Sequence, residues 1–415
     1  MSNKGYNKVP LGDVLKEVYR YPTYYGIDYT AQGVLEIRGE FLNSNGSISV
    51  VNPRYISNET NSRFPKTQLE KDDIVMSVRG TLGKVGIITD DLAGANITAN
   101  LLRLSPDKDL ISGKYLLYYF LSSAFNNSLE NASESTTIKT IKVPELKSIK
   151  IPLPSLKEQR KIAEILSSVD AAIEKTEQVI AKTEEVKKGL MQQLLTKGIG
   201  HTEFKQTEIG TIPFNWTIST TKDVLYIKGR IGWKGLKKEE FTEDGPYLIT
   251  GIHFKDNRVD WDSCFHIPQY RYTESPEIMV SNGDILITKD GTIGKLAYVE
   301  DLPGEASLNS HLLLLRPIKD FVNGKYIYYV LQSQQFLNYI YSYQTGSTLK
   351  GMSQKTFESY KFAVPSYREQ IQIVNVLDSY ENIISNEKQY LNQLYKLKCG
   401  LMQQLLTGQV RVKVD

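Results

Sequence analysis

The sequence is poor in cysteine, in histidine and in long apolar runs. Two of its 415 residues are cysteine, Cys264 and Cys399, and four are histidine. None lies in a C-x-x-C or paired-ligand spacing, so we expect neither a disulfide framework nor a structural zinc. The longest aliphatic run, Leu312 to Leu315, is far shorter than the ~20 apolar residues of a membrane span. No apolar segment follows Met1, so we expect no secretory signal, no membrane and a cytoplasmic protein.

A strong excess of one charge is also missing. Fifty Lys and Arg residues oppose 47 Asp and Glu, and the sequence pI of about 8.4 lies below the range of a stand-alone nucleic-acid binder. If this chain binds DNA, other subunits must supply much of the phosphate neutralisation. Tyrosine is the one abundant outlier, with 26 residues against 13 phenylalanines. That excess suits wet contact surfaces, although a compositional bias of the genome explains it equally well.

The strongest pattern is an internal repeat. Shifting the chain by 211 residues places 72–199 on 283–410 without a gap, with 43 identities in 128 columns. The octapeptide Gly189 to Thr196 recurs letter for letter as Gly400 to Thr407. Residues 1–71 and 205–282 share only short echoes. One scaffold has therefore been duplicated, and its two copies diverge at the front.

Each copy ends in a segment that predicts a long helix. From Leu156 to about Lys197, and again over the matching part of the second copy, apolar residues recur at heptad positions a and d. Ser155 with Glu158, and Ser366 with Glu369, form capping boxes at the predicted starts, and a glycine follows each predicted end. Forty residues at ~1.5 Å each make a rod of ~60 Å. The rest of each half predicts a mixed α/β globule, including single helices at 114–125 and 325–336.

These segments resemble the specificity (S) subunit of type I restriction-modification systems. The resemblance is carried by Pro152 to Gln159 and Val364 to Gln370, by the strand Gly283 to Leu286 with its copy Asp72 to Val75, and by the loop Gly346 to Thr348. Asp72 departs from the usual glycine of that strand, and Ser135 stands where Gly346 does. The resemblance implies an α+β fold: two similar mixed α/β target recognition domains, joined by two long antiparallel coiled-coil helices in a pseudo-twofold repeat.

The implied domains are a first target recognition domain at 1–155, a first spacer helix at 156–198, a second recognition domain at 199–365, a second spacer helix at 366–408 and a tail at 409–415. The resemblance further implies that each recognition domain reads one half of an asymmetric bipartite site in double-stranded DNA. Two methyltransferase (M) subunits would dock on the helices, and restriction/translocase (R) subunits would join through the complex. S-adenosylmethionine, ATP and Mg would be bound only by those partners.

Candidate DNA contacts come from three kinds of segment. Turns with two glycines and a lysine follow a strand at 79–84 and 289–295, where backbone N–H groups and a lysine can meet a phosphate; a turn kept for folding alone is the alternative. Polar loops at 133–139 and 343–350 align, with a solvated connection as the alternative. The front segment 19–29 is rich in tyrosine, with packing beneath a loop as the alternative, and the front segment 228–238 is rich in basic residues. The full candidate set is Tyr24, Tyr25, Arg38, Arg79, Lys84, Thr137, Lys139, Arg230, Trp233, Lys234, Lys289, Lys295, Ser347, Thr348 and Lys350.

No catalytic constellation is expected. Asn52-Pro53-Arg54-Tyr55 has Arg54 in place of the second proline of an adenine methyltransferase motif, and neither turn has the spacing of a P-loop. We interpret the chain as a non-catalytic specificity subunit. The alternative is a coiled-coil scaffold or an orphan S-like module whose globular ends bind proteins rather than DNA.

Overall fold

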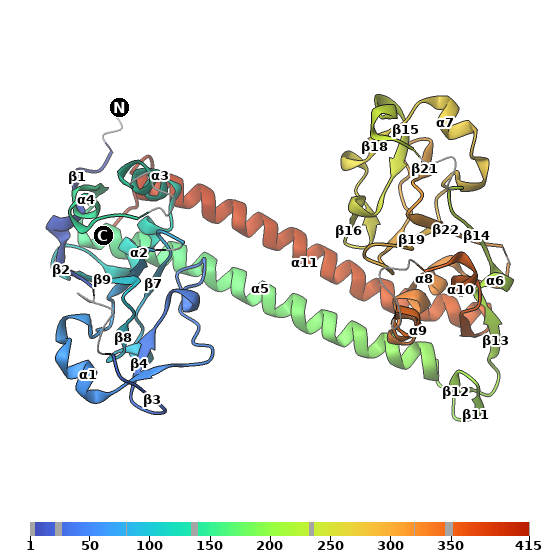
Figure 1. The fold of residues 1–415 in the computed structure, drawn as a ribbon, viewed down its shortest axis with the longest axis horizontal. Helices are drawn as coiled ribbons and strands as arrows, with labels where there is room; N and C mark the ends of the chain where they lie inside the picture. The colour runs from blue at the N-terminus through green and yellow to red at the C-terminus, as the bar shows by residue number, and fades with distance from the viewer. Residues whose placement is uncertain are drawn as a thin grey trace. The chain divides into compact units, whose positions relative to one another are not determined.

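The fold is seen in a computed structural model, which describes residues 5–20, 27–79, 81–133, 140–231, 236–318, 320–344 and 352–414. The chain divides into two compact units (Figure 1). The first comprises residues 1–178 and 388–415, and the second comprises residues 179–387. Each unit therefore contains one globule and one part of each long helix.

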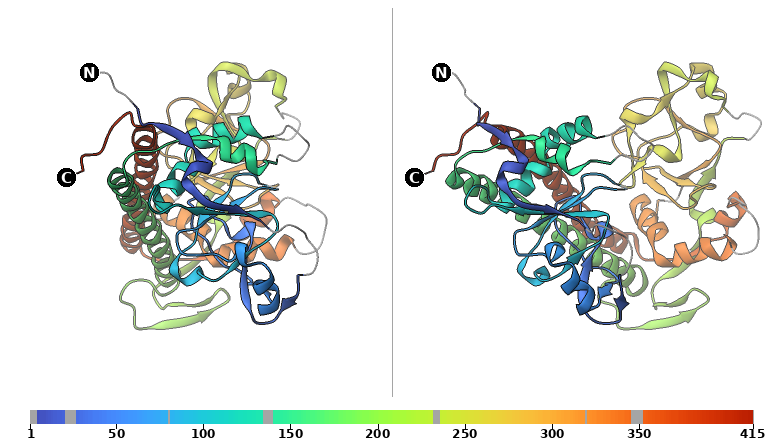
Figure 2. Two further views of the ribbon diagram at one scale, coloured as in Figure 1. Left: turned by 90° about the vertical axis from the view of Figure 1, so that its left-hand side faces the viewer. Right: turned by 60° about the vertical axis from the view of Figure 1, so that its left-hand side comes forward.

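The first unit contains a four-stranded antiparallel sheet in the order β2-β9-β6-β7. A second small sheet, β3-β5-β4-β8, joins β4 to β8 in parallel, and β1 pairs with β10. Both chain ends lie in this unit (Figure 2). Its elements are β1 (Lys8–Pro10), β2 (Leu15–Tyr19), β3 (Tyr29–Thr30), β4 (Val34–Ile37), β5 (Tyr55–Ile56), α1 (Asn58–Arg63), β6 (Ile74–Ser77), β7 (Val85–Ile87), β8 (Asn96–Ile97), β9 (Leu101–Pro106), α2 (Gly113–Phe120), α3 (Ser123–Ala132), α4 (Val143–Ser148), β10 (Lys150–Pro152) and the start of α5 (Leu156–Lys197).

The second unit repeats this plan with additions. Its largest sheet has the order β14-β22-β19-β20-β17-β16, and β18-β15-β21 and β13-β23 correspond to the smaller sheets. Its elements are β11 (Phe204–Thr207), β12 (Gly210–Pro213), β13 (Thr217–Thr220), α6 (Thr221–Val224), β14 (Leu225–Lys228), β15 (Thr242–Ile249), β16 (Phe254–Lys255), β17 (Arg258–Val259), β18 (Phe265–His266), α7 (Gln269–Thr273), β19 (Ile285–Thr288), β20 (Leu296–Tyr298), β21 (Ala306–Leu308), β22 (Leu312–Pro317), α8 (Gly324–Gln332), α9 (Gln334–Gln344), α10 (Gln354–Glu358), β23 (Lys361–Val364) and the start of α11 (Tyr367–Thr407).

The two sheets share one register. Ile74 pairs with Leu104 in the first unit, and Ile285 pairs with Leu315 in the second, each partner displaced by the 211 residues of the repeat. The predicted single helices at 114–125 and 325–336 are wrong in one respect, because each is two helices. Ser122 and Ser333 interrupt them, and their side-chain oxygens accept from the N–H groups of Phe125 and Phe336. A serine that caps a new helix competes with continuation of the old one.

Nine tyrosines of the described residues are buried in the core. Tyr115 and Tyr326 are fully buried at equivalent positions, and their hydroxyls donate to the carbonyl oxygens of Pro152 and Ala363 at 3.1 and 2.9 Å. Each bond ties a helix of the globule to the strand that leads into a long helix. Burial raises the pKa of both hydroxyls, so they remain neutral donors. These two tyrosines serve the core.

The Glu-Gln pair at the start of each long helix has a structural explanation. The amide of Gln159 is buried: its nitrogen donates to the carbonyls of Leu110 and Pro154, and its oxygen accepts from Ser112. Gln370 makes the equivalent bonds to Phe321, Pro365 and Asn323. One side chain thus fixes the first turn of each helix to the loop before a globular helix.

The glutamates of the two pairs differ. Glu158 and Ser155 form the predicted capping box, with the Ser155 N–H donating to the Glu158 carboxylate at 3.1 Å. In the second copy, Ser366 still accepts from the Glu369 N–H. The Glu369 carboxylate instead accepts from the indole of Trp216 at 3.0 Å and from the backbone N–H of Ile199. The capping box is therefore confirmed in the first copy and half formed in the second.

Within each unit the two long helices run antiparallel. In the first unit Asp170 of α5 contacts Lys398 of α11. Glu177, seven residues further along α5, contacts Tyr395, which comes before Lys398 in α11. Val169, Ile173 and Leu394 form a buried cluster on the seam. Gly198 and Gly408 follow the helix ends with φ of +65° and +78°, as the sequence predicts. The helices are the coiled-coil elements that the heptads indicate.

Candidate nucleic-acid interface

The glycine-lysine turns have the same geometry in both units. Each connects two antiparallel strands, β6 to β7 and β19 to β20. A hydroxyl on the last residue of the first strand, Ser77 or Thr288, accepts from the backbone N–H of Lys84 or Lys295 at 2.9 Å. The N–H groups of Gly83 and Gly294 donate to the carbonyls of the same two hydroxyl residues.

This geometry corrects one part of the phosphate hypothesis. The four N–H groups of Gly83, Lys84, Gly294 and Lys295 already have partners inside the turn. They form no open cradle for an anion. Gly83 and Gly294 have φ of +83° and +86°, and their open faces pack on Leu129 and Ile340. Gly83 and Gly294 are therefore explained by folding, and the N–H groups of these four residues are not available to a phosphate, whereas the lysine side chains remain candidates for phosphate contact.

The charged candidates of the turns lie at the surface. Arg79, Lys84 and Lys295 are exposed, and Lys289 is partly buried. In the first unit, Arg38 is also partly buried: its guanidinium donates to the carbonyl of Asn52 at 2.8 Å and pairs with Glu40 at 2.9 Å. The structure therefore brings Arg79 and Lys84 together on one turn, and Lys289 and Lys295 on the other.

Arg230 is different from the other candidates. Its side chain is buried, and its guanidinium donates to the carbonyl of Leu308 and to the hydroxyls of Ser275 and Ser307. Burial lowers the pKa of the guanidinium, and the nearby Glu274 carboxylate opposes that shift. A group with its donors on buried protein atoms stabilises the fold. This placement counts against Arg230 as a DNA contact.

Nine candidates lie outside the described residues. They are Tyr24, Tyr25, Thr137, Lys139, Trp233, Lys234, Ser347, Thr348 and Lys350. Both polar loops and the core of the basic front segment belong to this group. These nine remain predictions.

A pocket beside the second turn contains residues that were not among the candidates. Its lining residues come from three segments: Thr250, Gly251 and Ile252, here called the wall; Thr288, Asp290, Thr292 and Lys295, here called the floor; and Asn309 with His311. The ring Nδ1 of His311 lies 2.7 Å from a carboxylate oxygen of Asp290, and both side chains are exposed. Ile252 is 77% exposed. The pocket thus combines a paired imidazole, an amide, hydroxyls, a lysine and an apolar side chain.

An ion pair with a buried carboxylate links β4 to the residue before β5 in the smaller sheet of the first unit. In the first unit the buried Glu36 carboxylate accepts from Arg54 at 2.6 Å, and the Arg54 guanidinium lies over the ring of Tyr29. Burial raises the pKa of Glu36, and the hydrogen bond from Arg54 opposes that rise. Arg54, the residue that breaks the methyltransferase-like motif, is therefore part of a structural ion pair.

The described residues offer neither a metal cluster nor a membrane-spanning helix. They contain no group of three or more His, Cys, Asp or Glu placed to hold a metal ion. None of their helices is both long and apolar enough to cross a membrane. Both cysteines are free thiols, and burial raises the pKa of the Cys264 thiol to about 12.

Comparison with known families decides the identity of the fold. The profile of the type I restriction modification DNA specificity domain matches residues 5–185 and again residues 213–396. The chain belongs to this specificity family. Its double match coincides with the internal repeat, and it favours the specificity subunit over the scaffold alternative.

Relatives and solved structures agree with this assignment. The chain is 26% identical over 418 residues to the type I restriction enzyme MjaVIII specificity subunit of Methanocaldococcus jannaschii, covering 98% of this chain and 90% of that protein. It is 24% identical over 332 residues to the EcoKI specificity subunit of Escherichia coli K12, covering 74% and 67%. The crystal structure of the type I S subunit from M. genitalium matches with a TM-score of 0.58 at 17% identity, covering 98% of this chain and 97% of that one. That structural match bears on the fold alone.

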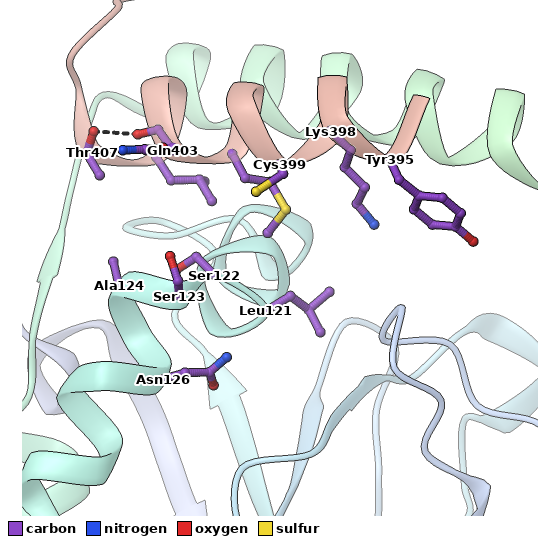
Figure 3. A pocket seen from close by; sticks show the side chains of 12 residues that line it. Leu121, Ser122, Ser123, Ala124, Asn126, Tyr395, Lys398, Cys399, Gln403 and Thr407 are labelled. Carbon is purple, nitrogen blue, oxygen red and sulfur yellow. Dashed lines mark hydrogen bonds between the residues drawn. The ribbon is translucent and has the colours of Figure 1, made fainter. Parts of the chain in front are cut away.

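A groove in the first unit of this specificity subunit involves the repeated octapeptide (Figure 3). Leu121, Ser122, Ser123, Ala124 and Asn126 line one side of it. Tyr395, Lys398, Cys399, Met402, Gln403, Leu406 and Thr407 of α11 line the other. Figure 3 shows Lys398 and Tyr395 at the end of the groove away from Thr407. Four of these lining residues belong to the segment that α5 repeats without change.

Proposed function

We propose that this chain is the non-catalytic DNA-recognition subunit of a type I restriction-modification complex. Each globule reads one half of an asymmetric bipartite site in double-stranded DNA. The observation that carries the proposal is the double match to the specificity profile, on two globules that share one strand register. The unlike front segments 1–71 and 205–282 favour unlike half-sites.

The long helices serve two tasks in this proposal. They set the gap between the half-sites, and they dock two methyltransferase subunits. An identical octapeptide in both helices supports the second task, because two copies of one partner require two copies of one surface. Restriction subunits join through the complex. S-adenosylmethionine, ATP and Mg act in the partners, and the assembly works in the cytoplasm, where the DNA is.

The near-neutral charge supports shared DNA binding. Affinity for duplex DNA comes largely from neutralising phosphates, and a chain with a net charge of +3 offers little surplus for this. Two contacts on a stiff connection gain from their high effective concentration once both half-sites are engaged. The isolated chain is therefore expected to bind DNA weakly and with strong dependence on salt.

The test is methylation of DNA by the reconstituted complex. This chain and the methyltransferase subunit encoded with it are expressed together, and the methylated adenines of the host are sequenced. A bipartite motif that disappears when this gene is deleted supports the proposal. Methyl transfer by this chain alone, or an unchanged motif without it, contradicts the proposal.

A further inference from the structure

The backbone around the pocket of the second unit has a counterpart in the first unit. In both units a parallel strand pair comes just before the lining segments, joining Ile37 to Ile97 and Ile249 to Leu308. The N–H groups of Thr98 and Asn309 donate to the carbonyls of Ile37 and Ile249, each at 3.1 Å. Short 3-10 turns follow at Gly39–Phe41 and Gly251–His253. The wall therefore has one backbone frame.

The floor of the pocket has one frame as well. The N–H of Val78 donates to the carbonyl of Asn100, and the N–H of Lys289 donates to the carbonyl of His311, each at 3.0 Å. The Ser77 and Thr288 hydroxyls organise the turns in the same way. We call the pocket-lining residues of the second unit and their counterparts in the first unit the two rims. Each position on one rim therefore has a defined partner on the other.

Comparing the partners separates two classes of side chain. Three positions keep their residue: Gly39 and Gly251, Thr81 and Thr292, and Lys84 and Lys295. Five change their chemistry: Arg38 to Thr250, Glu40 to Ile252, Arg79 to Asp290, Thr98 to Asn309 and Asn100 to His311. The changes exchange cations, anions, amides and apolar groups on an unchanged backbone. A constant frame with variable surface chemistry is what two readers of different ligands require.

The chemistry of the second rim suits the edges of base pairs. His311 is 63% exposed and held by Asp290, so its ring is oriented and still accessible. The Asn309 side-chain oxygen accepts from the His311 N–H at 3.1 Å, which fixes the amide and keeps its NH₂ group as a donor. Ile252 presents an apolar surface of the kind that meets a thymine methyl group. Oriented donors and acceptors beside an apolar contact are the means of direct readout in the major groove.

We propose that the five variable rim positions choose the bases of each half-site, and that the constant Lys84 and Lys295 contact phosphates. The inference rests on the proposed function and adds the residues that set its specificity. In the second unit the rim is Thr250, Ile252, Asp290, Asn309 and His311. In the first it is Arg38, Glu40, Arg79, Thr98 and Asn100. The rim reads duplex DNA through base edges, and the lysines hold the register on the backbone.

The test exchanges rim residues for their own counterparts. His311→Asn and Ile252→Glu are made in the complex with its methyltransferase subunit, and methylation is measured on duplexes in which each half-site is randomised in turn. The preferred bases of the second half-site should change, with discrimination at an affected position altered by about 5- to 150-fold. The first half-site should stay as in the wild type. Asn100→His and Glu40→Ile should do the reverse, which keeps the test decisive if one pair of variants fails to assemble.

Two controls separate reading from general binding. Ile318→Glu changes an isoleucine that is 52% exposed at the far end of strand β22 from His311, about 20 Å away, and should alter neither half-site. Lys295→Ala should weaken binding to all sequences alike and reduce the salt dependence by about one phosphate contact.

The outcomes are distinguishable. If the wild-type complex methylates a bipartite motif, but all four exchanges leave both half-sites unchanged, the rim does not read bases and only this inference fails. A change at the opposite half-site would also overturn it. If the wild-type complex methylates no bipartite motif, the proposed function itself fails.

Discussion

Lys398 of α11 forms an ion pair with Asp170 of α5, with 2.6 Å between its Nζ and the carboxylate. The hydroxyl of Tyr118 donates to the other oxygen of Asp170 at 2.7 Å. The second unit repeats the ion pair, because Lys187 pairs with Glu381 at positions displaced by 211 residues. Tyr329, the counterpart of Tyr118, donates instead to Asp378. Both lysines occupy d positions of the heptads, where a charge costs stability but specifies register. These pairs define which residues of the two helices face one another.

The register pair is expected to be worth about 1 kcal/mol. Its side chains are 14% and 30% exposed, so its coupling should lie between that of surface pairs and that of fully buried ones. A double-mutant cycle of Lys398→Met and Asp170→Asn, followed by urea unfolding, measures the coupling. Lys182→Met, at an exposed site on α5, is the control and should be nearly neutral. No coupling between the pair would show that the lysine does not fix the register.

The contact between Glu158 and Arg411 predicts a loss of stability in acid. Arg411 donates to both carboxylate oxygens of Glu158, at 2.8 and 2.9 Å. Burial of Glu158 raises its pKa, but the hydrogen bonds from Arg411 and Ser155 outweigh burial and lower it overall. A carboxylate whose pKa is lowered in the folded state contributes its full stabilisation at pH values above the ordinary glutamate pKa of about 4.3. This contribution disappears as the pH falls through the pKa of the folded state.

The measurement is the free energy of unfolding of wild type and Glu158→Gln between pH 7 and pH 3. The wild type should be the more stable at pH 7, and the difference should shrink below about pH 4. Glu164→Gln, at an exposed site on the same helix, is the control and should differ little from wild type throughout. A difference that grows in acid would contradict the assigned direction of the pKa shift.

Alanine substitutions at Gly83 and Gly94 form a matched pair of variants that tests how the glycine-lysine turn packs. Both glycines have positive φ. A Cβ on Gly83 would lie 2.6 Å from the Leu129 side chain, whereas a Cβ on Gly94 would have no neighbouring atom within 4 Å. Alanine at either site carries a backbone cost of about 1 kcal/mol. Gly83→Ala should lose a further ~1–3 kcal/mol through overpacking. Equal losses in urea unfolding would show that the turn does not pack as described.

The sequence predicted what depends on periodicity and repetition. The heptads predicted both long helices, the strand expected before each glycine-lysine turn is present at Ile74–Ser77 and Ile285–Thr288, and Ser155 with Glu158 marked a helix start. It did not predict that Ser122 and Ser333 would begin new helices, because an apolar helical pattern continues across both. That decision depends on tertiary packing.

The candidate site was less predictable. Its place in a basic segment of the sequence predicts that Arg230 is a surface cation. In the structure its guanidinium is buried and donates to three residues far away in the sequence, Ser275, Ser307 and Leu308. The rim residues Asn309 and His311 were missed because no single motif marks them. Their signal was present in the repeat alignment, where they stand opposite Thr98 and Asn100 as changes next to a strand in which four of six residues match. Only the pairing of β15 with β21 places Ile252 in the same pocket as Asn309 and His311.

Matched insertions in the two helices should lengthen the gap between the half-sites. One heptad is added between Lys182 and Lys188, and one opposite it beside Glu381, so that the a/d contacts are kept. Seven residues add about 10 Å, or about 3 base pairs. The methylated motif of the mutant should keep both half-sites and gain this gap. An active mutant with an unchanged gap would show that the helices do not set the spacing.

The most direct test of the whole account is a domain exchange. Residues 205–365 are replaced by the same region of a relative with a known bipartite motif, and the adenines methylated by the resulting complex are sequenced. One half-site should become that of the relative, while the other half-site and the gap between them remain those of the original complex. A motif in which both half-sites change, or in which neither does, would contradict the account of two independent readers on one spacer.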